Sequence, residues 1–239
     1  AEKIGLVKNC GFDGIEMPAL PDHDHAKELA RLAKDAGIRL HSVIYGGWEA
    51  PLSHPDAAKI EEGKAGVENA LRAGKAMGAD NILLVPAVVN ADVRYVEAYE
   101  RSQKHIRELL PLAEELKVQI AVENVWNDFL LSPLEFARYV DEFDSPWVQA
   151  YFDVGNVVAF GYPQDWIRTL GKRIVKVHLK DFKRNEREWV NLGDGSVNWP
   201  EVRSALHEVG YTGFTTAELN RGDEAFHRDL AGTIDSLLG

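Results

Sequence analysis

The chain has 239 residues, of which 45% are hydrophobic, and its formal net charge is −11. This size is enough for one sizeable core, so we expect a single domain over residues 1–239. The acidic charge argues against a nucleic-acid partner or an anionic membrane surface, because both need a basic footprint. A lone cysteine excludes an intrachain disulfide, and no apolar run reaches the roughly eighteen residues of a spanning helix. We therefore expect a cytoplasmic protein.

Helix and strand patterns alternate along the chain without a linker. Helical periodicity is found over residues 2–9, 25–36, 57–77, 92–116, 134–143, 164–170, 201–209 and 224–238. Apolar, strand-like runs occupy residues 14–18, 39–45, 81–89, 119–125, 148–154, 174–182 and 214–219. Ser132, followed by Pro133 and Glu135, forms a capping box, and Asn198 begins a second one. Pro111 is expected to bend or split the long fourth helix.

Strands that alternate with helices imply parallel βα units with right-handed crossovers, and their repetition favours a (β/α)8 TIM barrel. The pattern supplies eight helices but seven strands, because the chain opens inside a helix. We therefore expect an α/β TIM barrel that lacks its first strand, with a gap between the strands at 14–18 and 214–219. Another segment could fill this gap, and an upstream targeting segment is left open.

Four residues of the kinds that bind metals stand at or near the ends of these apolar runs. Glu123, Asp153, His178 and Glu218 follow the runs I-A-V, A-Y-F, V-K-V and T-T-A. Because ligands of α/β proteins gather beyond the carboxyl ends of parallel strands, four such residues on one rim indicate a divalent-metal site.

Strand alternation agrees with this interpretation, because successive side chains point to opposite faces. Lys176 shares a face with His178. Val175, Val177 and Leu179 are predicted to point the other way, under the helices. One face of the sheet would thus become polar towards its end, as expected for a barrel lumen.

The ordered motifs resemble those of the xylose-isomerase-like TIM barrels, a superfamily of sugar and sugar-phosphate isomerases and epimerases. The resemblance spans the whole chain. It is carried by G-F-D-G-I-E at 11–16, A-V-E-N at 121–124, D-V-G-N at 153–156, V-H-L-K-D at 177–181, L-G-D-G-S-V-N-W at 192–199 and G-Y-T-G-F-T-T-A-E at 210–218. The branch that looks most similar is the ketose 3-epimerases, including L-ribulose and L-xylulose 5-phosphate 3-epimerases.

The resemblance implies one divalent cation held by Glu123, Asp153, His178 and Glu218, and it implies that the two glutamates also move protons. Two carboxylates on opposite faces of an enediolate could remove a proton from one side and return one on the other. Three carboxylates and one imidazole suit Mn²⁺, Co²⁺ or Mg²⁺, with Zn²⁺ left open.

Five further residues are candidates for substrate binding. Arg184 lies six residues after His178, the spacing of a substrate-binding arginine in sugar 3-epimerases of this family, although it could equally be a solvated loop cation. Lys180 could reach an anionic group, but a carboxylate partner is the simpler interpretation. Glu16 and His41, at or near earlier strand ends, are weaker candidates for contacts with sugar hydroxyls.

The fifth candidate, Asn156, departs from the pattern of many free-sugar 3-epimerases, which have histidine at that position. An amide can bond a hydroxyl but cannot become cationic, which weakly favours a sugar-phosphate substrate. The chain also lacks the many histidines of the three-zinc site of endonuclease IV relatives, so a nuclease is excluded.

Three functions therefore remain: a ketose or ketose-phosphate 3-epimerase, which is favoured; an aldose-ketose or hydroxypyruvate-type isomerase or dehydratase with the same site; and a sugar-binding protein without catalysis. The expected partner is a small sugar or sugar phosphate. A homodimer or homotetramer is left open.

Overall fold

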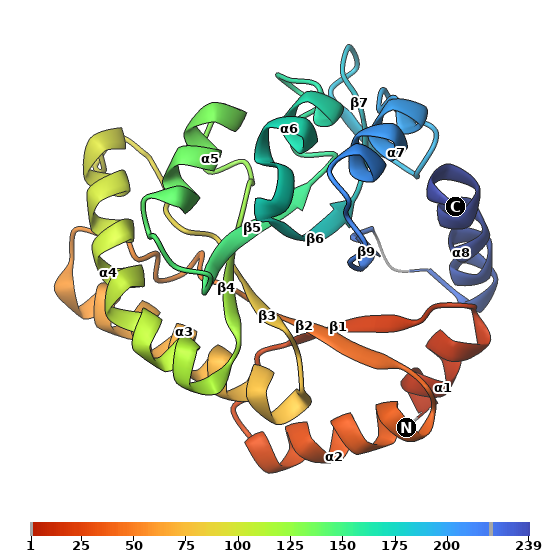
Figure 1. Ribbon diagram of the computed structural model, residues 1–239, viewed down its shortest axis with the longest axis horizontal. Helices are drawn as coiled ribbons and strands as arrows, with labels where there is room; N and C mark the ends of the chain where they lie inside the picture. Colours follow the sequence, from red (N-terminus) through yellow and green to blue (C-terminus); the bar gives the residue numbers. More distant parts are fainter. Residues whose placement is uncertain (1, 220–221) are drawn as a thin grey trace.

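The computed structural model describes residues 2–219 and 222–239. Seven parallel strands form one sheet in the order β1-β2-β3-β4-β5-β6-β9, and the helices lie outside the curved sheet (Figure 1). The strands are β1 (Gly14–Pro18), β2 (Arg39–Gly46), β3 (Asn81–Leu84), β4 (Gln119–Glu123), β5 (Val148–Asp153), β6 (Ile174–Leu179) and β9 (Thr215–Ala217). The helices are α1 (Glu2–Asn9), α2 (His23–Asp35), α3 (Ala57–Met77), α4 (Tyr95–Leu116), α5 (Pro133–Asp141), α6 (Pro163–Leu170), α7 (Trp199–Glu208) and α8 (Glu224–Leu238), with a 3-10 turn at Gly171–Arg173. The predicted alternation is confirmed.

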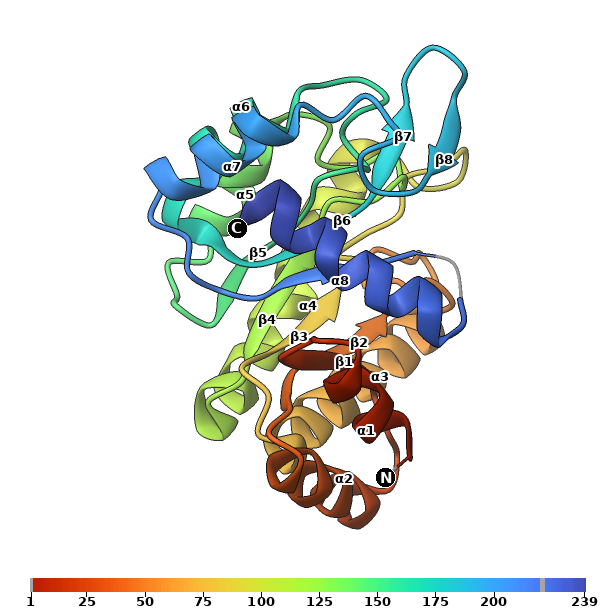
Figure 2. The same cartoon turned by 90° about the vertical axis from the view of Figure 1, so that its right-hand side faces the viewer.

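The sheet is an almost closed barrel with an open seam. Within the described residues, β1 pairs with β2 alone and β9 pairs with β6 alone, so the predicted gap between the first and last strands is confirmed. Helix α8 lies beside this gap (Figures 1 and 2). Side chains reach across it: the ring of His41 stacks on Phe214 with centroids 4.3 Å apart. A Cβ at Gly14 would lie 2.6 Å from the Phe214 ring, so glycine is needed there.

Two local predictions are corrected, and one of the two alternatives for a third is excluded. The predicted strand 174–182 is divided into β6 and a short strand β7 (Asp181–Lys183), which forms an antiparallel hairpin with β8 (Glu188–Val190). The strand predicted over 81–89 ends at Leu84. Helix α4 continues through Pro111, so it is not split, since burial of Leu109 and Ala113 on either side offsets the missing backbone hydrogen bond.

The interior has two apolar regions. The larger fills the space between the sheet and the helices and contains Val177 and Leu179, as predicted. A small cluster of Leu83, Ala121 and Tyr151 forms the second, and Val175 packs against it. The prediction for Val175 was therefore wrong. The register of β5 and β6 shifts at this point, with Ala150 opposite Ile174 and Tyr151 opposite Lys176, and the extra residue interrupts the alternation.

No helix in the described ranges combines the length and the apolar character needed to span a membrane.

Candidate metal centre

Four acidic and imidazole side chains converge at the carboxyl ends of adjacent strands. Glu123 and Asp153 are the last residues of β4 and β5, His178 is the penultimate residue of β6, and Glu218 follows β9 directly. One potential ligand atom from each residue lies within 4.8 Å of the others. The parallel register explains the convergence, because Asp153 is paired with His178 and the next strand places Thr216 opposite His178.

His178 lies at the middle of this cluster. Its Nδ1 is 2.8 Å from Glu123 Oε1, 3.0 Å from Glu218 Oε2 and 3.9 Å from Asp153 Oδ2. Its Nε2 faces the opposite way, 2.6 Å from Oε2 of Glu16 on β1. The imidazole, the Glu123 carboxylate and the Asp153 carboxylate are almost fully buried, whereas the side chain of Glu218 is 48% exposed. The cluster is therefore open to solvent on the Glu218 side.

Asp153 is held rigidly by two asparagines. Its backbone N–H donates to Asn124 Oδ1 at 2.8 Å, and the Asn124 amide donates back to the Asp153 carbonyl at 2.9 Å. The backbone N–H of Asn156 donates to Asp153 Oδ1 at 2.7 Å. Among the residues that the structure describes, Asp153 Oδ2 is buried without a hydrogen-bond partner.

A buried carboxylate oxygen without a hydrogen-bond partner destabilises the folded protein unless a positive charge or a metal ion compensates it. The Lys180 ammonium supplies part of the compensation, 3.2 Å from Asp153 Oδ2 and 2.8 Å from Glu218 Oε2. Three carboxylates and one imidazole nitrogen around a shared centre are also a donor set that a divalent cation accepts. The residues present therefore fit a metal ion.

The pKa values of the cluster are strongly perturbed. Burial raises the pKa of Glu123 to about 7, and burial likewise raises the pKa of Asp153. Burial opposes ionisation of Glu218 too, but His178 and Lys180 outweigh it and lower the pKa of Glu218 to about 2. Burial alone would lower the pKa of His178, yet the surrounding carboxylates, Glu123 first, hold it well above its usual value. Such perturbed groups in one cluster mark a functional site.

Comparison with known proteins identifies the fold family. Residues 4–236 match the family of xylose isomerase-like TIM barrels. The chain belongs to this family.

The chain is also similar to L-ribulose-5-phosphate 3-epimerases. The L-ribulose-5-phosphate 3-epimerase UlaE of Escherichia coli O1:K1 is 27% identical over 228 residues, which cover 89% of this chain and 79% of that protein. UlaE of Shigella boydii serotype 18 shows the same identity and coverage. These relatives are sugar epimerases, enzymes of the isomerase class, as the motifs indicated.

Two solved structures share the fold of this chain. A D-psicose 3-epimerase crystallised in the presence of D-fructose has a TM-score of 0.84 and 22% identity, covering 100% of this chain and 93% of that one. The IolI protein with a bound zinc atom has a TM-score of 0.80 and 20% identity, with coverages of 98% and 90%.

Lys180 and Arg184 have partners within the chain. Lys180 is paired with two carboxylates of the cluster, which was the simpler of its two interpretations. Arg184 follows β7; its guanidinium donates to the Gly161 carbonyl at 2.5 Å and lies 4.5 Å from the centroid of the Tyr162 ring. Neither observation tests a contact with substrate.

Asn156, His41 and Glu16 each have a hydrogen-bond partner within the protein. The Asn156 amide donates to the Asn124 carbonyl at 2.9 Å and is buried, so the residue gives no basis for choosing between free and phosphorylated sugars. His41 is the third residue of β2, near its amino end, and the prediction of a strand-end position was wrong. Burial lowers its pKa to about 4. Glu16 has both carboxylate oxygens engaged by protein groups.

Sequence reasoning missed Asn124, which holds a residue of the cluster, and Asp181, which holds a nearby loop along the chain. Asn124, the residue directly after β4, braces Asp153, as described above. Asp181, almost fully buried, accepts hydrogen bonds from the backbone N–H groups of Phe182, Gly193 and Val197 and from the Trp199 indole. Both stand inside motifs that carried the family resemblance, A-V-E-N and V-H-L-K-D, but nothing in the sequence showed their partners.

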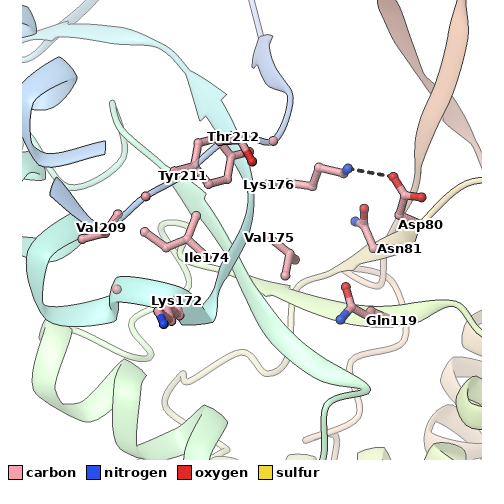
Figure 3. A pocket seen from close by; sticks show the side chains of 13 residues that line it. Asp80, Asn81, Gln119, Lys172, Ile174, Val175, Lys176, Val209, Tyr211 and Thr212 are labelled. Atoms are coloured by element: carbon pink, nitrogen blue, oxygen red, sulfur yellow. Dashed lines mark hydrogen bonds and ion pairs between the residues drawn. The ribbon is translucent and has the colours of Figure 1, made fainter. Parts of the chain in front are cut away.

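A cavity of about 460 Å³ lies at the opposite end of the lumen (Figure 3). Its lining includes Asn81, Gln119 and Ile174, the first residues of β3, β4 and β6, and Lys176, whose ammonium is 3.1 Å from Asp80 Oδ2. None of the four clustered residues lines it. In barrels of this kind the amino-end face serves stability rather than chemistry.

Proposed function

We propose that this protein is a sugar 3-epimerase that acts on a ketose or ketose phosphate with one divalent metal ion. The observation that carries the proposal is the convergence of Glu123, Asp153, His178 and Glu218 on one centre at the carboxyl ends of the strands. The names of the relatives in the same family support the choice of reaction. We propose these four residues as the metal ligands.

When bound, the cation would act as a Lewis acid that stabilises the negative charge of an enediolate. The two glutamates are proposed to transfer the protons. In the metal-free site His178 and Lys180 lower the pKa of Glu218 and keep it ionised, so its carboxylate is available to accept the proton from C3. Glu123 is the second carboxylate beside His178 and is proposed to return a proton on the other face. In the reverse direction the two roles exchange.

The other residues are proposed to prepare the site. Asn124 and the backbone of Asn156 fix Asp153, so that its buried oxygen is directed at the shared centre. Lys180 balances part of the negative charge of the three carboxylates. Arg184 remains the proposed contact for a hydroxyl or phosphate of the substrate, because its fork of donors suits both groups.

The reaction is tested by incubating the protein with a panel of ketoses and ketose phosphates in D₂O with Mn²⁺, Co²⁺ or Mg²⁺. Deuterium at C3 together with the epimer is the expected result. Deuterium at C1 or C2 with formation of an aldose would instead establish an aldose-ketose isomerase. Absence of exchange with every sugar and metal would contradict a catalytic function.

The metal centre is tested separately from the reaction. Crystals soaked in Mn²⁺ should contain one ion at about 2.0–2.6 Å from oxygens of the three acids and from a nitrogen of His178. An ion that one of the four residues fails to reach would show that the ligand set is wrong.

A further inference from the structure

The buried carboxylate of Glu16 is in direct contact with the imidazole of the proposed metal centre. Glu16 lies in the middle of β1, and its side chain is 6% exposed. One carboxylate oxygen is 2.6 Å from His178 Nε2, and the other accepts the hydroxyl proton of Tyr151 on β5. Both oxygens are thus engaged inside the lumen, which leaves Glu16 poorly placed for the sugar contact that its sequence position predicted.

The two nitrogens of His178 have different surroundings. Nδ1 faces the carboxylates of Glu123, Asp153 and Glu218, so it is the nitrogen that could bind a shared cation. A neutral imidazole carries one proton, and a nitrogen that binds a metal must offer its lone pair. The proton must then be on Nε2, where Glu16 can accept it.

We propose that Glu16 is a positioning residue of the metal centre: it accepts the Nε2–H of His178, fixes the tautomer with the Nδ1 lone pair directed at the three acids, and holds the ring in that orientation. This inference rests on the proposed metal site. Metal-bound histidines commonly donate their second N–H to a carboxylate, which also makes the bound nitrogen a stronger donor. The contact joins residues 162 positions apart in the chain.

The same contact has a structural consequence at the open seam. Strand β1 is an edge strand that, within residues 2–219 and 222–239, pairs only with β2. Through Glu16 it is also tied to Tyr151 and His178 on β5 and β6, across the lumen. A cation that holds His178 would therefore also restrain β1, and slower hydrogen exchange of the β1 amides on metal addition is expected.

The test measures Mn²⁺ affinity of the intact protein by calorimetry, independently of any sugar. Glu16→Gln keeps an acceptor oxygen but loses the charge, and Glu16→Ala removes both. We expect about tenfold weaker binding for the first and about a hundredfold for the second, the range found for such outer partners of a metal ligand. Tyr151→Phe is the matched control: it removes the other partner of Glu16 and keeps the contact with His178, so its affinity should stay near that of the wild type.

A second measurement reads the tautomer directly. In the Mg²⁺-loaded wild type, ¹⁵N NMR of His178 should show the proton on Nε2, and Glu16→Ala should lose this single-tautomer signature. Circular dichroism establishes whether each variant is folded. If Glu16→Ala does not fold, the Mn²⁺ affinity and the tautomer of Glu16→Gln decide the role of Glu16. Equal Mn²⁺ affinity in wild type and Glu16→Gln, with the Nε2 proton retained, would overturn the role of Glu16. Failure of the wild type to bind any divalent ion would instead overturn the metal centre itself.

Discussion

The clearest stability prediction concerns Asp181, which organises the loop that follows the β7–β8 hairpin. Its Oδ1 accepts from the backbone N–H groups of Phe182 and Val197 at 2.9 and 3.2 Å, and its Oδ2 accepts from Gly193 N–H and the Trp199 indole, both at 3.0 Å. The packing is close: a Cβ at residue 195 would lie 2.0 Å from Asp181 Oδ1. This carboxylate fixes the loop of residues 191–198.

Asp181→Asn should destabilise the protein because it replaces one acceptor oxygen with an NH₂ group. The N–H of Gly193 and the indole of Trp199 would then face a donor. Each lost hydrogen bond to a buried charged group is worth about 1.5–3 kcal/mol, so two cost about 3 kcal/mol or more. For a protein of this length that loss lowers Tm by about 6–12 °C.

The control is Asp194→Asn, the same change in the same loop at an exposed residue. Thermal unfolding followed by circular dichroism, at fixed metal concentration, compares the two variants. We expect Asp194→Asn to melt within about 2 °C of the wild type, as substitutions at exposed positions usually do. A melting temperature of Asp181→Asn equal to that of the control would refute the reasoning.

Three further predictions concern the site and the seam. Glu123→Gln and Glu218→Gln should each lower turnover by about a hundredfold or more at saturating metal; wild-type turnover in either variant would remove the two-base proposal. Mn²⁺ affinity should rise from pH 6 to pH 8. The pKa of His178 is raised and that of Glu123 is about 7, so both side chains must release protons when the metal binds, and they bind it less well as the pH falls. An affinity that calorimetry finds to be independent of pH would contradict this prediction. Gly14→Ala should destabilise by about 1–3 kcal/mol, since the new methyl would overlap the Phe214 ring, and denaturant unfolding measures it.

The fold and the four clustered residues could be predicted because each depends on local patterns. Buried strands in a βα repeat appear as short apolar runs, and a residue at the end of such a run is at the carboxyl rim whatever the rest of the chain does. The gap between the first and last strands was predicted from the same patterns, because they supply seven strands for eight helices. Val175 shows the limit of this reasoning, because a single shift in register moves a side chain to the other face and leaves no mark in the sequence.

The roles of the surrounding residues could not be predicted, because each depends on a partner far along the chain. Glu16, Asn156 and His41 all belong to segments that the sequence marked correctly, but their bonding is decided by tertiary packing. Asn156 is 32 residues from the carbonyl that its amide contacts, and the ring of His41 stacks on Phe214 across the seam. A polar residue near a strand end can therefore contact substrate or brace its neighbours, and only the partner distinguishes the two roles.

The gap between β1 and β9 is bridged by side chains of the proposed metal centre. In a closed barrel each strand is held on both sides by backbone hydrogen bonds, whereas here β1 and β9 each have one strand partner among the described residues. Glu218 stands directly after β9, and Glu16 lies on β1. Both carboxylates lie within 3.0 Å of His178 on β6. The imidazole thus joins the two edge strands through side chains where the backbone does not, so the residues proposed to bind the cation also contribute to closing the barrel.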